Sequence, residues 1–365
     1  MNTWVHPLPV TGWLSWLAVL LTIGFPTIAV SQTAIPQPTK TLKIGIAGCD
    51  TSHVVAFTRL INHPEAEGAL SRMTVVAAFP GGSPDLEASA TRLDGFTEQL
   101  RGLGVTIVDD CQQLTQQCDA FLLESVDGRA HLTLFRQLAC GKPIFVDKPA
   151  AASLRDLLAI QQLAEDTDTP WFTSSALRYC DQVTELQKSP PLSNGAPITA
   201  VETSSPYKTE SHHPDLFWYG IHGVESLFAL MGPGCESVSC VEGNQLVATG
   251  IWNDGRLGTY RGIKTPTNND AYRFTVYGQK EINQISGFSG YAGLVREIGD
   301  FLESGKPAVD FEQTVQMFAF MEAAQESKKR QGQHVSLQWA VQRAQQSLPT
   351  PEPGSLPDVE AKQQP

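Results

Sequence analysis

Positive charge is scarce in this sequence. Against 38 Asp and Glu residues there are 26 Lys and Arg residues, and the net charge is −12 at pH 7. No cluster of Lys and Arg interrupts this acidic balance. Binding to nucleic-acid phosphates or to anionic lipid needs concentrated positive charge. We therefore expect neither nucleic acid nor a membrane surface as a partner of the folded body.

Two cysteine and serine motifs are also missing. The seven cysteines contain no C-x-x-C, so they lack metal-ligand spacing, and there is no G-x-S-x-G elbow to mark a serine hydrolase. Two cysteine pairs are close enough in sequence to bond in an oxidising compartment: Cys111/Cys118 and Cys235/Cys240. The alternative is that cysteines serve as small buried apolar side chains, which we expect at least as strongly for Cys49 and Cys140.

The N-terminal stretch lacks charge altogether. Trp13 to Val30 is rich in Leu, Ile, Val and Ala, and Ala29-Val30-Ser31 is a small-residue cleavage pattern. Residues 1–31 are therefore predicted to be a secretory signal. The alternative is an uncleaved anchor, because no Lys or Arg precedes the run and the run is almost long enough to cross a bilayer. Either interpretation exports the body to the periplasm or the extracellular space.

The body is predicted to hold two domains between a polar linker at 32–40 and a disordered Pro/Glu/Gln-rich tail at 347–365. In residues 41–150, short apolar strands alternate with amphipathic helices, which is typical of a Rossmann domain with a doubly wound parallel sheet. Its expected strands are 42–47, 73–79, 105–108, 120–123 and 143–146, and its first two expected helices are 51–62 and 86–100.

Residues 151–346 have a different pattern. A capping box at Ser153 opens a helix, and turns rather than helices join the strands that follow. These expected strands are 170–177, 198–204, 246–252, 257–260 and 272–277, with a hairpin turn at 253–256. Two late helices carry apolar stripes around Ile298 and Phe318. This half is predicted to be an α+β domain with a largely antiparallel open sheet.

The turn after the first strand departs from the dinucleotide-binding fingerprint. It reads G-x-D-x-x-H, so only Gly48 matches G-x-G-x-x-G. Asp50 is expected to cap the helix that begins at Thr51 and to occupy amides that would otherwise hold phosphate. The hydroxyls of Thr51 and Ser52 would partly compensate as phosphate donors. His53 is bulky for the third glycine's place and is expected to turn toward the pocket.

The second strand ends without the acidic residue that would bind an adenosine ribose. The chain there reads Phe79-Pro80-Gly81-Gly82-Ser83, so Gly81 and Ser83 would tolerate a 2′-phosphate. If a dinucleotide binds, we expect NADP rather than NAD.

Lys148 follows the fifth expected strand, at the sheet edge where parallel sheets bind ligands. A partly desolvated lysine there could polarise a substrate hydroxyl and exchange its proton. Asp147 is a candidate for cofactor binding. The alternative is a surface lysine paired with Asp147.

The segment 143–149, Pro-Ile-Phe-Val-Asp-Lys-Pro, resembles the Glu-Lys-Pro segment of the Gfo/Idh/MocA family of oxidoreductases. Residues 295–307 and 320–327 resemble that family's closing helices, and 219–223 its glycine-histidine motif. The resemblance implies a Rossmann domain followed by an α/β domain whose sheet face often serves oligomerisation, so a homo-oligomer is expected. It also implies NAD(P)-dependent oxidation or reduction of sugars and polyols, or, in a few members, redox-assisted glycoside hydrolysis.

The resemblance makes His222 a general base or substrate ligand. The family's orienting aspartate, four residues earlier, is here Trp218, and Asp215 could substitute for it. Trp218 and Tyr219 offer flat apolar surface for a sugar ring. Arg178 is placed either at the pocket or on the surface. A metal site is the alternative to a polar substrate pocket here and ranks below it. Its ligands would come from His212, His213, Asp215, His222 and Glu225.

Two functions remain open. One is an exported NAD(P)-dependent oxidoreductase on a sugar-like or polyol-like substrate, which works by hydride transfer with Lys148 as proton relay and His222 as base or ligand. The other is an extracytoplasmic carbohydrate-binding or scaffold protein that keeps the fold with an altered cofactor cleft.

Overall fold

The computed structural model describes residues 42–265 and 269–348. These residues lie in one compact unit, Pro38–Pro365. The predicted signal peptide, the linker and nearly all of the predicted tail lie outside the described residues. Within the described ranges, no helix is both long and apolar enough to cross a membrane.

The first half of the chain builds a six-stranded sheet in the order β3-β2-β1-β4-β5-β6, in which every pairing is parallel. Its strands are β1 (Leu42–Ala47), β2 (Met73–Phe79), β3 (Thr106–Ile107), β4 (Ala120–Leu123), β5 (Ile144–Val146) and β6 (Trp171–Thr173). The chain runs outward from β1 to β3 and then starts again beside β1 with β4. This is the doubly wound Rossmann sheet that the sequence predicts.

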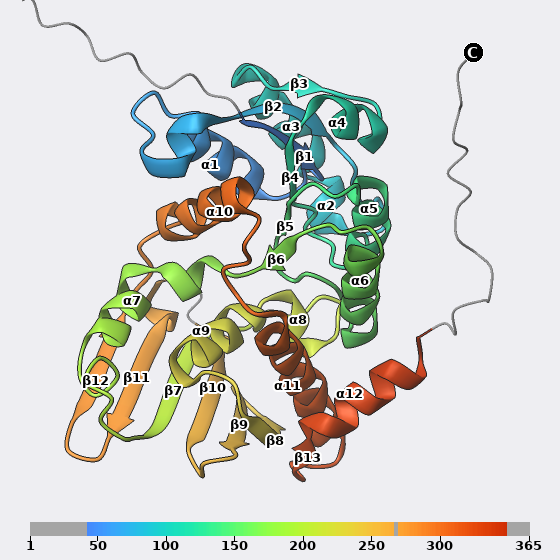
Figure 1. The fold of residues 1–365 in the computed structure, drawn as a ribbon. Helices are drawn as coiled ribbons and strands as arrows, with labels where there is room; N and C mark the ends of the chain where they lie inside the picture. The colour runs from blue at the N-terminus through green and yellow to red at the C-terminus, as the bar shows by residue number, and fades with distance from the viewer. Residues whose placement is uncertain (1–41, 266–268, 349–365) are drawn as a thin grey trace, which may run out of the picture. The chain divides into compact units, whose positions relative to one another are not determined.

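Helices cover both faces of this sheet (Figure 1). They are α1 (Ser52–Ile61), α2 (Glu87–Ala90), α3 (Leu93–Gly102), α4 (Cys111–Gln117), α5 (His131–Leu138) and α6 (Leu154–Asp166). A helix from the far end of the chain, α10 (Ala292–Ser304), also lies beside α1 and packs on this sheet (Figure 1). Buried Phe57, Phe145 and Phe301 belong to the same apolar cluster, so the last part of the chain completes the core of the first.

The second half builds a mixed seven-stranded sheet in the order β12-β11-β7-β10-β9-β8-β13. Only β7 and β10 pair in parallel, and the other pairings are antiparallel. Its strands are β7 (Ile198–Pro206), β8 (Cys235–Glu242), β9 (Leu246–Trp252), β10 (Leu257–Ile263), β11 (Arg273–Gly278), β12 (Ile282–Ser286) and β13 (Val335–Ser336). The predicted largely antiparallel sheet is confirmed.

The remaining helices of the described residues pack around this second sheet. They are α7 (Asp181–Lys188), α8 (Asp215–Trp218), α9 (Ile221–Met231), α11 (Phe311–Lys329) and α12 (Leu337–Gln346). Helix α9 lies on β7 and β10, and α11 lies on β8. The sequence prediction missed α4, α7, α8 and α12, and also strands β8, β12 and β13.

Two predicted elements are wrong in extent. The helix expected at 86–100 is two helices, because the Thr91 hydroxyl bonds the Glu87 carbonyl and the Arg92 side chain bonds the Ala88 carbonyl at the break. The strand expected at 170–177 is only β6, which pairs in parallel with β5 instead of joining the second sheet. A short 3-10 helix, Ala176–Tyr179, follows it.

None of the seven cysteines forms a disulfide, and all of them lie in described ranges. The two sequence-adjacent pairs are therefore unbonded. Cys49 is buried as predicted, whereas the prediction for Cys140 is wrong, since that side chain is exposed.

Candidate functional site

The turn between β1 and α1 is held tightly by its neighbours. Gly48 has φ +90°, and a Cβ added there would lie 2.5 Å from the Ser125 backbone nitrogen. The Gly48 and Cys49 amides donate to the carbonyls of Phe79 and Pro80, at 2.9 and 2.7 Å. Glycine is thus required at position 48 by the close approach of the β4 loop as well as by the backbone conformation.

Asp50 does not cap α1, so this prediction is wrong. The residue is fully buried, and its two carboxylate oxygens accept hydrogen bonds from the Val126 amide at 2.8 Å and the Ser89 hydroxyl at 2.6 Å. Thr51 is the N-cap instead, and its hydroxyl accepts from the His53 amide at 3.4 Å. The Val126 amide and the Ser89 hydroxyl hold the Asp50 carboxylate away from the start of α1, so the helix amides remain available to other groups.

A cavity of about 150 Å³, here called the Lys148 pocket, opens where the start of α1, the end of β5 and the start of α9 meet. Seven of the predicted site residues line it: Thr51, Ser52, His53, Lys148, Trp218, Tyr219 and His222. Seven residues that the sequence did not single out complete its wall: Arg92, Val126, Ala176, Leu177, Tyr272, Phe288 and Tyr291. A larger cavity of about 360 Å³ lies against Trp171 and Phe311, and none of the predicted site residues lines it.

Lys148 stands partly exposed in this pocket. It forms no ion pair with any described residue, because Asp147 bonds His53 Nδ1 at 2.7 Å instead. The alternative of a surface lysine paired with Asp147 is therefore wrong.

His222 lies in the first turn of α9, and its Nδ1 is 2.7 Å from the Ser175 hydroxyl. Burial, and then the charge of Lys148, lower the pKa of His222 well below its ordinary value, so the ring is neutral near pH 7. Asp215 does not orient this ring, since its carboxylate pairs with Lys328 at 2.6 Å. Ser175, which the sequence gave no reason to choose, takes that place.

Aromatic rings surround His222. The Tyr219 ring meets it edge-on with centroids 5.4 Å apart, and Trp218 lies against His213 at 4.9 Å. Both rings border the Lys148 pocket, as the proposed sugar-stacking surface requires.

The other seven predicted site residues do not line this pocket, and four of them, Gly48, Asp50, Asp147 and Asp215, are described above. Arg178 is in the 3-10 helix after β6, where it pairs with the buried Glu225. Ser83 is buried, and its amide donates to the Ser89 hydroxyl at 2.8 Å. Gly81, with φ +63°, lies against the backbone of Gly48.

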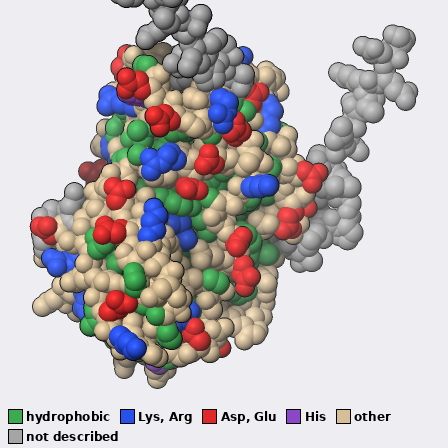
Figure 2. Space-filling model, turned by 60° about the vertical axis from the view of Figure 1, so that its left-hand side comes forward, with side chains coloured by type: hydrophobic (Ala, Val, Ile, Leu, Met, Phe, Trp, Pro, Cys, Tyr) green, Lys and Arg blue, Asp and Glu red, His purple; other side chains and the backbone are tan. Residues whose placement is uncertain are grey.

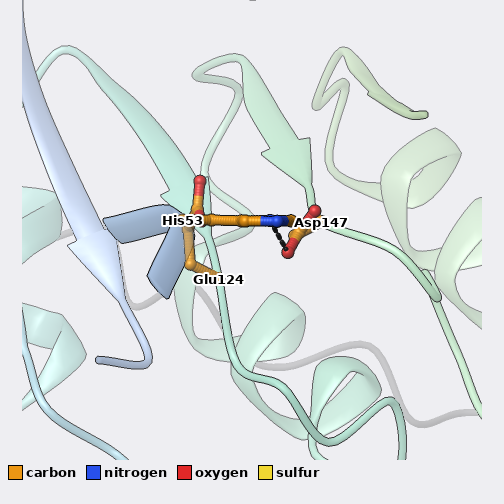
Figure 3. Close-up of side chains that lie close together, drawn as sticks. All are labelled: His53, Glu124 and Asp147. Carbon is orange, nitrogen blue, oxygen red and sulfur yellow. Dashed lines mark hydrogen bonds and ion pairs between the residues drawn. The ribbon is translucent and has the colours of Figure 1, made fainter. Parts of the chain in front are cut away.

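The candidate metal ligands named from the sequence do not come together. His213 bonds Glu210 at 2.9 Å, Asp215 bonds Lys328 and Glu225 bonds Arg178. A different group of ligand-type side chains does meet in the described part of the chain: His53, Glu124 and Asp147 (Figure 3). We call it the His53 cluster.

Both carboxylates of the His53 cluster are buried. Burial, together with the negative charge of Asp147, raises the pKa of Glu124 well above its ordinary value. Burial alone would raise the pKa of Asp147 too, but the charge and hydrogen bond of His53 lower it. The same sheet edge therefore holds two carboxyl groups with opposite pKa shifts, which is common at functional sites.

The structure was compared with known proteins. No protein-family model matches the chain, and no curated protein matches it. Solved structures do match. A probable dehydrogenase from Thermotoga maritima is 18% identical with a TM-score of 0.67, and the match covers 82% of this chain and 100% of that one. Scyllo-inositol dehydrogenase from Lactobacillus casei, with bound NAD(H) and scyllo-inositol, is 15% identical with a TM-score of 0.63, over 82% and 100% of the two chains. GenD2 from gentamicin A biosynthesis, in complex with NAD, is 14% identical with a TM-score of 0.66, and the match covers 83% of this chain and 99% of that one.

The chain has the fold that these solved structures share. The resemblance seen in the closing helices and the Asp-Lys-Pro segment is thereby confirmed at the level of the fold.

Two of these solved structures hold NAD or NAD(H), and the residues of this chain fit part of such a dinucleotide. Ser52 is exposed at the start of α1, and Asp50 leaves that helix end to other groups, so phosphate fits there. The Lys148 pocket, at about 150 Å³, is smaller than the roughly 300 Å³ at which small-molecule pockets begin. It is too small for a whole dinucleotide. The fit is therefore confined to the phosphates.

Proposed function

We propose that this protein is an oxidoreductase that acts on a hydroxyl or carbonyl group of a carbohydrate-like substrate with a nicotinamide dinucleotide. One observation carries the proposal: Lys148 and His222, from different halves of the fold, line the same small pocket as the start of α1. When bound, the cofactor would supply the hydride acceptor or donor, with its phosphates held by Ser52 and the α1 amides.

The chain's own residues supply the proton chemistry. Lys148 has no carboxylate partner, so its ammonium group is available to polarise a substrate oxygen and to exchange a proton with it. His222 is neutral near pH 7, and Ser175 fixes its Nδ1 at 2.7 Å, so Nε2 is the nitrogen left for a substrate hydroxyl. Trp218 and Tyr219 give the sugar ring an apolar surface.

The structural neighbours support the substrate class, since one of them holds scyllo-inositol. NADP rather than NAD is proposed because the loop that follows β2, Pro80–Ser83, carries no acidic residue. A carboxylate there would attract a ribose diol and repel a 2′-phosphate.

The deciding experiment uses the purified protein. One sample of the protein is denatured, and any cofactor that it releases is identified by mass. NAD and NADP are titrated into a second, cofactor-free sample. Turnover of a polyol and aldose panel is followed by nicotinamide absorbance. We expect Lys148→Ala to lower kcat about 100-fold or more, because loss of a positioned proton donor costs that much. Lys188→Ala, an exposed lysine on α7, is the matched control and should keep full activity.

A second candidate, a carbohydrate-binding protein without turnover, is favoured by one observation. Asp50 and Asp147 are both buried beside the start of α1, and their combined charge opposes phosphate there. If neither dinucleotide binds while the Lys148 pocket still takes a polyol, the oxidoreductase proposal fails and the binding protein remains.

Two further properties concern self-association and nucleic acid. Apolar Val247, Ile251 and Leu257 belong to β9 and β10, and each is partly or fully exposed. We propose that this sheet face joins copies of the chain. Light scattering tests this, because the particle mass of Ile251→Glu should fall below that of the wild type.

On the face in Figure 2, acidic and basic side chains are interspersed, so it offers no basic patch for nucleic acid. Export stays a prediction from residues 1–31.

A further inference from the structure

The His53 cluster lies at the topological switch point of the first sheet. Glu124 follows β4 directly, Asp147 follows β5 directly, and His53 is the second residue of α1, which begins after β1. Strands β1, β4 and β5 are neighbours in that sheet. Ligands of open α/β sheets bind where the strand order reverses, beyond the carboxyl ends of the strands. The three side chains therefore meet at the most favourable ligand position of this fold.

The geometry of the cluster suits one small ion. One ligand atom from each residue lies within 4.8 Å of the other two. Figure 3 shows the single hydrogen bond among them, from His53 Nδ1 to Asp147 at 2.7 Å, with Glu124 alongside. The residues are between 0% and 7% exposed, so water does not reach them freely.

Three of the four carboxylate oxygens in the cluster lack a partner among the described residues. They are both Glu124 oxygens and Asp147 Oδ1. Lys148 is the neighbour in sequence, but it forms no ion pair with either carboxylate in the described structure. Buried polar atoms are hydrogen-bonded in the great majority of cases, and an ion is one of the explanations for an exception.

The ring of His53 is held in place independently of any ion. It stacks on Phe57 with centroids 5.1 Å apart and meets the edge of Tyr291 at 4.8 Å. Phe57 is itself in the core of the α1 face. A ligand ring fixed in this way loses little freedom on binding, which favours affinity.

We propose that His53, Glu124 and Asp147 bind one divalent transition-metal ion at the wall of the Lys148 pocket. Two carboxylates neutralise the double charge, and an imidazole nitrogen favours Zn²⁺ or Mn²⁺ over Ca²⁺ and Mg²⁺, which prefer oxygen alone. Three protein ligands leave at least one coordination position for water or a substrate hydroxyl. His53 lines the pocket, so this position is accessible from the side where the substrate binds. The inference does not depend on the nicotinamide cofactor.

The test measures metal binding and not activity. Tag-free full-length protein is stripped with a chelator, and Zn²⁺, Mn²⁺ and Co²⁺ are titrated calorimetrically, with bound metal counted by mass spectrometry after desalting. We expect one equivalent per chain, release of a proton on binding, and a visible Co²⁺ band that reports protein ligands. Glu124→Gln, which keeps the side chain's shape, should weaken binding about 100-fold or more, since even supporting groups outside the ligand set change affinity by 10–100-fold.

His212→Asn is the matched control. That residue is in a separate surface cluster of titratable groups with Glu210 and Asp85, and its loss should leave the stoichiometry and affinity unchanged. If Glu124→Gln fails to fold, judged by circular dichroism, His53→Gln takes its place. Binding that is absent in the wild type, or equal in wild type and Glu124→Gln, overturns the proposal and leaves a proton shared by the two carboxylates as the explanation of the cluster. Neither result bears on nicotinamide binding, which is measured separately.

Discussion

Replacement of Gly48 by alanine gives the sharpest test of how the first turn is built. A Cβ at this position would lie 2.5 Å from the Ser125 nitrogen and 2.7 Å from its Cα. Both are backbone atoms, so no side-chain rotation relieves the clash. The φ of +90° adds a second penalty for any residue with a Cβ.

The magnitude follows from two costs and one gain. Left-handed backbone costs an L-residue roughly 1–2 kcal/mol, and forcing an extra carbon into a packed region costs about 1–3 kcal/mol. The loss of glycine's freedom in the unfolded chain offsets about 0.4–1 kcal/mol. We therefore expect Gly48→Ala to lower the free energy of unfolding by about 1–5 kcal/mol.

The assay is urea unfolding followed by circular dichroism, with the free energy extrapolated to water. Gly95→Ala is the matched control, since Gly95 is exposed inside α3 and an added Cβ there meets nothing within 4 Å. It should gain up to about 1 kcal/mol, as glycine is a poor helix residue. If Gly48→Ala stayed within about 0.5 kcal/mol of the wild type, the close approach to Ser125 would be refuted as the reason for this glycine.

Two further predictions concern buried charges. Arg178→Met leaves Glu225, only 1% exposed, without its cation, and should cost about 3–5 kcal/mol of unfolding free energy, whereas Arg155→Met breaks an exposed pair and should cost about 1 kcal/mol or less. Equal losses would contradict the difference in burial. Burial alone would raise the pKa of Asp127, but hydrogen bonds from His213 and Arg129 lower it far below its usual range. The stability that ionised Asp127 gives the folded protein is therefore complete above pH about 4 and is lost as the pH falls below that value. Asp127→Asn should be less stable than the wild type at pH 7, and it should lose less stability than the wild type between pH 5 and 3. Parallel stability–pH curves for the two proteins would refute this.

The sequence predicted the fold well because apolar periodicity decides it. Continuous apolar strands such as 42–47 and 120–123 cannot face water on either side, so they require a parallel sheet covered twice. Strands β8 and β12 were missed for the opposite reason. β8 alternates buried with less buried residues, β12 alternates exposed with half-buried ones, and both carry polar side chains, so their composition does not separate them from loops.

The site was predicted in part. Lys148 and His222 could be found because each follows from a local pattern, a strand end and a helix start. Ser175 and Glu124 could not, because nothing near them in the sequence marks them. Their roles come from β6 and β4 ending beside other elements, which is a property of the assembled sheet. Asp215 was placed wrongly for the same reason: sequence proximity to His222 did not reveal Lys328 on α11.

The departures from the glycine fingerprint are best understood together. In the structure Asp50 has two hydrogen-bond donors and one oxygen of Asp147 has His53, so these two buried carboxylates are matched to groups supplied by the same altered turn or its neighbours. His53, in the third glycine's place, is what satisfies Asp147. Glu124 alone has no partner among the described residues. Leaving a buried carboxylate unsatisfied costs about 1–3 kcal/mol or more, and the raised pKa of Glu124 reflects that cost, so the polar arrangement of this turn is incomplete at Glu124. A divalent cation in the His53 cluster would complete it, and by reducing the negative charge beside α1 it would also make that helix start more favourable for phosphate.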